Sequence, residues 1–315
     1  MKTKSIQVAI SVLLLIGFFY FIDTSEMFSV ISHSDKWNFF LACIFSFCGN
    51  IACAFRWTKI LNCDSKMKFW KAIKAYFESI SFTTFVPVGM LGSDFYRSVR
   101  LSSSNSSGKL SSTLNPSKEV LLSVLADRVH GLWALCFLAL LTIFYSIIFE
   151  SNIFPANEVY LKQSIFIFFY LLLLIIVVAA PFLISKIKIF FSKSTIELST
   201  VNLLLLRSKK KITIFASVLS QVFFAASFFL CLSATSVNIS VTQCLIIVPI
   251  IFLSAAIPLS LAGFGPREYS VAIILSFLGF GLENSVASSI LFGLTITLQG
   301  IGFLLINLIF YPKHR

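Results

Sequence analysis

The sequence predicts an all-α polytopic membrane protein, and three observations support that fold class. Of the 315 residues 57% are hydrophobic and only 12% are charged, whereas a soluble domain carries about 25% charged residues. Several apolar runs reach the ~20 residues that a helix needs to cross the hydrocarbon of a bilayer. Basic residues gather between alternate runs, as they do in cytoplasmic loops.

Six apolar segments are expected to cross the membrane completely. They lie at about 6–22, 39–57, 119–148, 163–185, 212–234 and 285–311. The first follows Lys2 and Lys4 but is not followed by a small-residue cleavage site, so an uncleaved helix is expected rather than a signal peptide. Two further apolar segments, 70–100 and 241–281, are interrupted by proline and glycine.

The interruptions predict two broken helices. The first break runs from Pro87 to Gly92 and the second from Pro258 to Gly263. Proline removes a backbone donor, and glycine lets the chain turn. Non-helical backbone at membrane depth is tolerated only where protein or a water-filled cavity shields it. The two breaks are therefore expected to be hairpin tips that meet inside the protein.

Loop charges predict that both interrupted segments are re-entrant and enter from opposite faces. Both flanks of 70–100 are basic, so this segment is expected to enter from the cytoplasm and return. Segment 241–281 is expected to double back from the outside, because a full crossing would put the basic C-terminus outside. Both termini are then cytoplasmic. Of the 25 basic residues, only four fall outside the cytoplasmic regions: Lys36, Arg128, Lys162 and Arg267.

This topology predicts one transmembrane domain, 1–315, built from an inverted repeat. Residues 1 to about 150 read span, span, hairpin, span, and residues from about 160 to 315 repeat that order in the opposite orientation. A proline, a glycine and an arginine follow one another in both breaks at nearly the same spacing. Inverted repeats with broken helices near the midplane are a known transporter design.

Charged residues beside the breaks predict an anion site. A helix that restarts after each break offers free N–H groups and a positive dipole end. Arg97 and Arg267 are expected close to those starts, where an arginine fork suits a phosphate. A structural alternative stays open: Asp94 with Arg97, and Arg267 with Glu268, are ion pairs that close the tips.

The third span carries a second charged cluster. Asp127 and Arg128 are expected roughly 12–14 Å from the start of this helix, and His130 shares a face with Asp127. Asp127 is a candidate partner of Arg97, Arg128 or Arg267. The alternative is a buried salt bridge that only locks the first hairpin to the span.

No catalytic residue, cofactor or metal site is predicted. The sequence holds no nucleophile elbow, P-loop or paired acidic motif, and its seven cysteines form no CxxC pair, as expected of small apolar core residues. The net charge of +12 is attributed to cytoplasmic loops and not to nucleic-acid binding. Gln221 is expected to make an interhelical hydrogen bond.

Four motifs resemble a known family. They are "FRWTKIL" from residue 55, "PVGMLGSDFYRSVRL" from residue 87, "SVLADRVHGLWAL" from residue 123 and "PLSLAGFGPREYSVA" from residue 258. In this order they resemble the flippase-like membrane domain of lysylphosphatidylglycerol synthases over roughly residues 8 to 310. Two details depart from the family pattern: Ser93 stands where a second glycine is frequent before Asp94, and Pro266 stands where valine is common before Arg267.

The resemblance implies movement of a phosphate-bearing lipid between leaflets of the cytoplasmic (inner) membrane. The cargo is either a phospholipid or a polyprenyl-phosphate-linked sugar, and envelope glycan or lipid biosynthesis proteins are candidate partners. Lysyl transfer is not expected, because the sequence shows no synthase part, and the protein is not expected to be an enzyme. Two alternatives stay open: a membrane-embedded transferase on a lipid-linked sugar, and a non-transporting scaffold.

Individual roles follow from this hypothesis. Arg97, Arg128 and Arg267 are expected to hold the phosphate headgroup while the tails remain in lipid. The other charged residues are expected to orient these arginines or to carry a coupling proton: Asp94, Asp127, Glu268 and His130.

Overall fold

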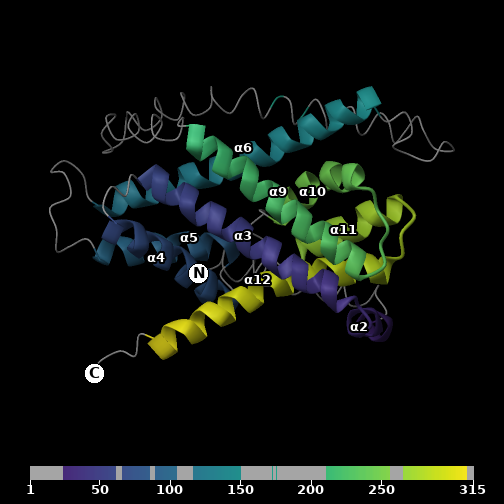
Figure 1. Cartoon of the computed structure of the whole chain (residues 1–315), viewed down its shortest axis with the longest axis horizontal. Coiled ribbons are helices and arrows are strands. Elements are labelled where there is room, and N and C mark those ends of the chain that lie inside the picture. The colour runs from purple at the N-terminus through teal and green to yellow at the C-terminus, as the bar shows by residue number, and fades with distance from the viewer. Residues whose placement is uncertain are drawn as a thin grey trace, which may run out of the picture. The chain divides into compact units, whose positions relative to one another are not determined.

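A computed structural model describes most of the predicted membrane segments. The described residues are 24–61, 66–85, 89–104, 116–149, 172, 175, 211–255 and 265–310. Every regular element within them is an α-helix (Figure 1), which confirms the predicted all-α class. The spans expected at about 6–22 and 163–185 lie outside the described residues, apart from the single positions 172 and 175.

Four long helices confirm four of the expected spans. They are α3 (Lys36–Leu61), α6 (Pro116–Phe149), α9 (Lys211–Ala234) and α12 (Leu282–Phe310). Each contains an apolar stretch of 24 to 26 residues with a mean hydropathy between 1.6 and 2.0. At ~1.5 Å per residue such a stretch is longer than the ~30 Å hydrocarbon core, so each is long enough to cross a membrane.

The two interrupted segments form pairs of shorter helices. The first pair is α4 (Lys66–Phe85) and α5 (Gly89–Ser104), and the second is α10 (Val241–Ala255) and α11 (Pro266–Phe277). Within the first pair, the rings of Phe82 and Tyr96 stack at 4.8 Å. Within the second pair, α10 and α11 pack against each other. Each interrupted segment therefore forms two helices that contact one another.

The position of the first break differs from the prediction. Helix α4 ends two residues before Pro87, but α5 already begins at Gly89, so Gly92 is helical and does not belong to the break. The physical reason is that a glycine inside a helix costs only ~1 kcal/mol, whereas a proline interrupts the ladder. Pro87, Pro258 and Gly263 lie outside the described residues, and the proximity of the two tips stays a prediction.

The chain forms two compact units, each drawn from several parts of the sequence. Unit 1 comprises Met1–Cys48, Phe77–Tyr96 and Phe223–Arg315, and unit 2 comprises Gly49–Tyr76 and Arg97–Val222. Both units contain residues from both predicted repeats. The units are therefore not the repeats, and the inverted repeat stays a prediction.

In unit 1 the helices are joined by buried aromatic and hydroxyl contacts. Ser227 of α9 donates its hydroxyl to the carbonyl of Ala42 in α3 at 2.8 Å. Phe228 of α9 contacts Phe252 of α10 and Phe292 of α12, with ring centroids 6.1 and 5.6 Å away. These contacts hold α10 and α12 against α9. The ring of Phe292 also lies 5.6 Å from the guanidinium of Arg267, at the start of α11.

Helix α11 ends in a tight turn that leads directly into α12. Gly279 adopts a φ of 86°, and its N–H donates to the carbonyl of Ser276 at 3.0 Å. The N–H of Phe280 donates to Leu275 at 3.0 Å. This pair of bonds is the Schellman arrangement that ends many helices with a glycine, and it returns the chain beside α11, which packs along α12.

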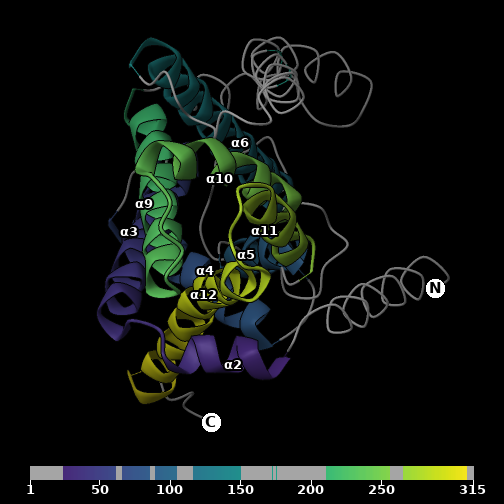
Figure 2. The ribbon, with the colours of Figure 1, turned by 90° about the vertical axis from the view of Figure 1, so that its right-hand side faces the viewer.

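A short helix lies in the connection between the first two expected spans, 6–22 and 39–57. Helix α2 (Thr24–Ser32) lies against α12 (Figure 2). Met27, Val30 and Ile31 follow the i, i+3, i+4 spacing of one helical face and pack on side chains of α11 and α12. No helix is expected there from the sequence, and α2 forms because its apolar face is buried against neighbouring helices.

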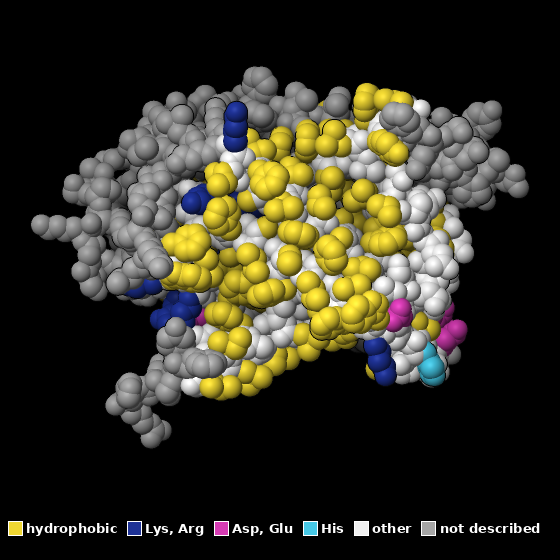
Figure 3. All heavy atoms as spheres, viewed as in Figure 1, with side chains coloured by type: hydrophobic (Ala, Val, Ile, Leu, Met, Phe, Trp, Pro, Cys, Tyr) yellow, Lys and Arg dark blue, Asp and Glu magenta, His cyan; other side chains and the backbone are white. Residues whose placement is uncertain are grey.

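Helix α3 exposes a stripe of large apolar side chains. At intervals of three or four residues it presents Trp37, Phe40, Ile44, Phe47 and Ile51, each more than 40% exposed. Hydrophobic side chains cover most of the face on which α3 and α9 lie in Figure 1 (Figure 3). Soluble monomers rarely expose a contiguous apolar surface of this kind, whereas lipid tails solvate it without cost.

Candidate functional site

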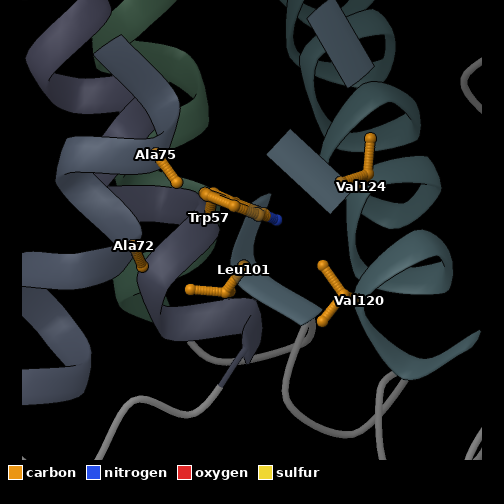
Figure 4. Close-up of a cluster of buried hydrophobic side chains, with 6 residues drawn as sticks. All are labelled: Trp57, Ala72, Ala75, Leu101, Val120 and Val124. Carbon is orange, nitrogen blue, oxygen red and sulfur yellow. The ribbon is translucent and has the colours of Figure 1, made fainter. Parts of the chain in front are cut away.

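The indole of Trp57 organises the core of unit 2. Its side chain is fully buried and donates its Nε1–H to the hydroxyl of Ser123 in α6 at 3.1 Å. Five apolar side chains from α4, α5 and α6 surround it (Figure 4): Ala72, Ala75, Leu101, Val120 and Val124. Trp57 thereby fixes the end of α3 relative to α6, and with it the position of the preceding residue, Arg56.

Asp127 is a buried carboxylate that is shared by two arginines. Arg56 donates its Nε–H to Oδ1 at 2.7 Å, and Arg97 donates from Nη1 and Nη2 to Oδ2 at 3.2 and 3.3 Å. All three side chains are at most 4% exposed. We call Arg56, Arg97 and Asp127 the arginine–aspartate cluster. One of the predicted partners of Asp127 is thus confirmed, and a second partner, Arg56, was not predicted.

Two aromatic rings hold the guanidinium of Arg97. Its Cζ lies 4.9 Å from the ring centroid of Trp57 and 5.5 Å from that of Tyr76, within the range of a cation–π interaction. Arg97 stands eight residues after Gly89, the first residue of α5, which is about 12 Å along the helix. The expectation that Arg97 lies near a helix start is therefore wrong, because α5 begins at Gly89 and not after Gly92, where the predicted break ended.

In the arginine–aspartate cluster the two guanidinium groups meet the same carboxylate, and the donors of Arg56 are only partly used. Nη2 of Arg56 approaches the sulfur of Cys53 at 3.7 Å, and its buried Nη1 has no hydrogen-bond partner among the described residues. An unsatisfied buried donor costs about 1–3 kcal/mol, more when it is charged. A ligand that supplies a negative oxygen at this position would satisfy the free donor of Arg56.

A second charged pair opens α11 in unit 1. Arg267 donates from Nη2 to Oε1 of Glu268 at 2.6 Å, and its Nε–H is shared between Oε1 and the hydroxyl of Ser289, each at 3.0 Å. Both charged side chains are buried. Arg267 is the second residue of α11, so its predicted place at a helix start is confirmed, and the ion pair proposed as a structural alternative is present.

Glu268 also shapes the start of α11. Its Oε2 accepts a hydrogen bond at 2.7 Å from the N–H of Gly265, the residue before the helix, as the third residue of a capping box does. Gly265 has a φ of 115°, which other residues rarely adopt. The Arg267–Glu268 pair is therefore charge-balanced and part of the local backbone geometry, unlike the arginine–aspartate cluster.

The remaining candidate residues lie near these groups on the same helices. Asp94 is buried on α5, three residues before Arg97. His130 is partly buried on α6, and Arg128 is exposed there although the adjacent Asp127 is buried, because successive helical residues point ~100° apart. The roles assigned to Asp94, Arg128 and His130 in headgroup binding or proton coupling stay predictions.

Gln221 makes the interhelical contact predicted for it. Its Nε2 donates to the carbonyl of Gly131 at 3.0 Å and joins α9 to α6 within unit 2. The contact lies one helical turn beyond Asp127 on α6, so Gln221 belongs to the surroundings of the arginine–aspartate cluster.

The chemistry that these groups offer is recognition of an anion. Guanidinium groups present planar forks of N–H donors that match phosphate and carboxylate. Among the described residues, no group of three or more His, Cys, Asp or Glu side chains is placed to hold a metal ion.

Sequence reasoning missed Arg56 because the charge rule placed it in a cytoplasmic loop. The structure places it four residues before the end of the apolar stretch Lys36–Ile60. The available signal was the pair Arg56-Trp57 in "FRWTKIL", in which a cation at the end of a span precedes a large aromatic residue.

Comparison with known proteins identifies the family. The family model described as "Lysylphosphatidylglycerol synthase TM region" matches residues 5–301, nearly the whole chain. Among curated proteins, none matches the chain. The family match agrees with the spanning helices and with the resemblance of the four motifs. The chain is thus a multi-pass membrane protein that belongs to the lysylphosphatidylglycerol synthase TM region family.

Proposed function

We propose that this protein is a lipid flippase that moves a phosphate-bearing lipid between leaflets. The observation that carries the proposal is the arginine–aspartate cluster: two buried arginines share a single carboxylate. Ionisable groups inside a membrane protein are costly and usually functional. A buried guanidinium whose Nη1 has no hydrogen-bond partner among the described residues suits a group that is itself negative, and the phosphate of a lipid headgroup has that chemistry.

In the proposed mechanism the headgroup crosses through the protein while the acyl or prenyl tails stay in lipid. In unit 2 Arg97 and Arg128 bind the phosphate, and in unit 1 Arg267 does so. The other charged residues orient the arginines or carry a coupling proton. They are Asp94, Asp127, Glu268 and His130. The stacking of Arg97 on Trp57 and Tyr76 supports this role, because a guanidinium already held in place loses less entropy on binding.

The proposed topology has six full spans and two opposed re-entrant hairpins, with both termini in the cytoplasm. Helices α10 and α11 have 15 and 12 residues, or about 22 and 18 Å. Both are shorter than the ~30 Å hydrocarbon core, and they pack on each other. These lengths support a segment that enters the membrane and returns.

The cargo is proposed to be a phospholipid or a polyprenyl-phosphate-linked sugar in the inner membrane. The family match supports a lipid as the transported class. We propose no catalytic step, and any coupling is to an ion gradient. Proteins of envelope glycan or lipid assembly are the proposed partners.

Reconstitution into vesicles tests the proposal. Purified protein is placed in vesicles with headgroup-labelled phosphatidylglycerol or a labelled polyprenyl-phosphate sugar, and label in the outer leaflet is destroyed by an impermeant reductant. Faster loss of inner-leaflet label than in protein-free vesicles is expected for at least one lipid. Equal rates for every lipid would refute transport, and a modified lipid product would indicate a transferase instead.

A further inference from the structure

We propose that Arg56, Gln221 and Gly131 form a phosphate-binding position of unit 2, and that Asp127 positions Arg56 for it. This inference rests on the proposed function and names residues that the sequence did not suggest. The anion would lie beside the backbone of α6 at Gly131, next to the Nη atoms of Arg56.

The donors of Arg56 show where an anion would sit. Nε is occupied by Oδ1 of Asp127 at 2.7 Å, and Nη2 approaches only the weakly accepting sulfur of Cys53 at 3.7 Å. Nη1 is buried without a hydrogen-bond partner in the described part of the chain. The Asp127 bond thus fixes the plane of the guanidinium and leaves Nη1 for a further acceptor.

Gly131 marks the space that these donors share. A methyl group added at Gly131 would lie 3.6 and 3.8 Å from Nη2 and Nη1 of Arg56, and 3.7 Å from Nε2 of Gln221. Nitrogen donors from α3 and α9 therefore converge on one point beside α6. An oxygen of a phosphate would lie farther from Gly131 than this point, in van der Waals contact with its Cα, where it could accept hydrogen bonds from both side chains.

The same point is accessible as well as polar. Gly131 is only partly buried, whereas Arg56 and Gln221 are at least 91% buried. The Gln221 amide already donates one hydrogen to the Gly131 carbonyl at 3.0 Å, and its second hydrogen is available for an anion. Alanine is the better helix former by about 1 kcal/mol. A glycine at position 131 is therefore explained if the space beside its Cα must stay open for the anion.

The variant Gly131→Ala provides a test that leaves the fold intact. The new methyl group would make ordinary van der Waals contacts, all at 3.6 Å or more, but it would keep a phosphate oxygen from contacting the Cα of residue 131. Gly302→Ala is the matched control, because this helical glycine of α12 has nothing within 4 Å of an added methyl group. Gln221→Met removes one donor at nearly constant volume and serves as the second variant.

The measurement is binding of dihexanoylphosphatidylglycerol, dihexanoylglycerol and inorganic phosphate to the purified full chain by titration calorimetry. Wild type and Gly302→Ala are expected to bind the phospholipid and not the phosphate-free lipid. Gly131→Ala and Gln221→Met are expected to weaken binding about tenfold, the loss of one charge-assisted or buried hydrogen bond. A different result is that inorganic phosphate binds wild type as tightly as the phospholipid does and binds Gly131→Ala less tightly. That result would confirm the site and assign it to free phosphate.

Two results would overturn the site: wild type binds neither phosphate compound, or Gly131→Ala binds the phospholipid as wild type does. Failure of the proposed function is a different observation. A protein that binds through Gly131 but moves no labelled lipid in vesicles keeps this site and refutes the flippase. If the protein moves lipid and Gly131→Ala moves it at the same rate, only this site is refuted.

Discussion

The Asp127 carboxylate holds two guanidinium groups in place inside unit 2. Arg56 reaches it from α3 and Arg97 from α5, and both are buried with it. Burial of charge is unfavourable unless the charges are paired and hydrogen-bonded. Asp127 is therefore the residue on which the geometry of both arginines depends.

Replacement of Asp127 by asparagine is expected to destabilise the protein by about 3–5 kcal/mol, because two buried positive charges lose their counter-charge. Thermal unfolding in detergent measures the effect. Arg128→Gln, at the exposed neighbouring position on α6, is the control and is expected to change stability by less than ~0.5 kcal/mol. Equal stability of the Asp127→Asn variant and wild type would contradict the pairing.

At this scale the sequence predicted part of the site. It named Arg97 as one of three candidate partners of Asp127, because an intramembrane carboxylate needs a cation. It could not select Arg56, since the pairing depends on how α3 rotates when Trp57 is buried. That rotation is a property of the packed core and is not visible in residue spacing.

The helices beside the breaks show a close approach that small residues make possible. Ser81 of α4 donates its hydroxyl to the carbonyl of Gly300 in α12 at 2.8 Å. A methyl group added at Gly300 would overlap the hydroxyl of Thr84 and lie 3.3 Å from the carbonyl of Ile80. Small residues that let two backbones approach are typical of membrane helix pairs.

Gly300→Ala is expected to separate α4 from α12 and to cost about 1–3 kcal/mol of stability through overpacking. Gly302→Ala, two residues further along α12, has no neighbour within 4 Å and is expected to be neutral or slightly stabilising. Thermal unfolding compares the two variants. A Gly300→Ala protein as stable as Gly302→Ala would show that α4 and α12 do not approach as described.

Element boundaries were predicted well where apolar runs are long and poorly where they are short. The described spans begin and end within about four residues of their predicted limits, and the largest difference is the extension of α3 to Leu61. Helix α2 was missed because its single apolar face, Met27, Val30 and Ile31, is stabilised only by contact with α11 and α12. An isolated helix of nine residues is unstable in water.

For the whole molecule, the charge pattern makes a testable prediction about topology. The connection between α9 and α10 contains the exposed residue Ser236 and is expected outside, whereas Lys313 near the C-terminus is expected inside. In a cysteine-free background, Ser236→Cys should react with an impermeant maleimide on intact cells, and Lys313→Cys should react only after lysis. Labelling of both on intact cells would show that segment 241–281 crosses the membrane.

Four of the membrane spans could be predicted among the described residues, because each depends on local hydropathy. The contact of the two breaks could not be resolved in this way, since it depends on how distant segments pack. The family match over residues 5–301 supports a lipid-related function for the molecule, but the phosphate chemistry is argued from the arginine–aspartate cluster.

The most direct test of the central claim is lipid movement in vesicles with an altered Arg97. The matched pair is Arg97→Ala and Arg100→Ala, since both arginines lie on α5 but the first is buried and the second exposed. Loss of one charge-assisted contact to the phosphate is expected to slow headgroup movement about tenfold or more in Arg97→Ala, with Arg100→Ala close to wild type. If correctly folded Arg97→Ala moves lipid as fast as wild type, the buried cluster is not the path of the headgroup.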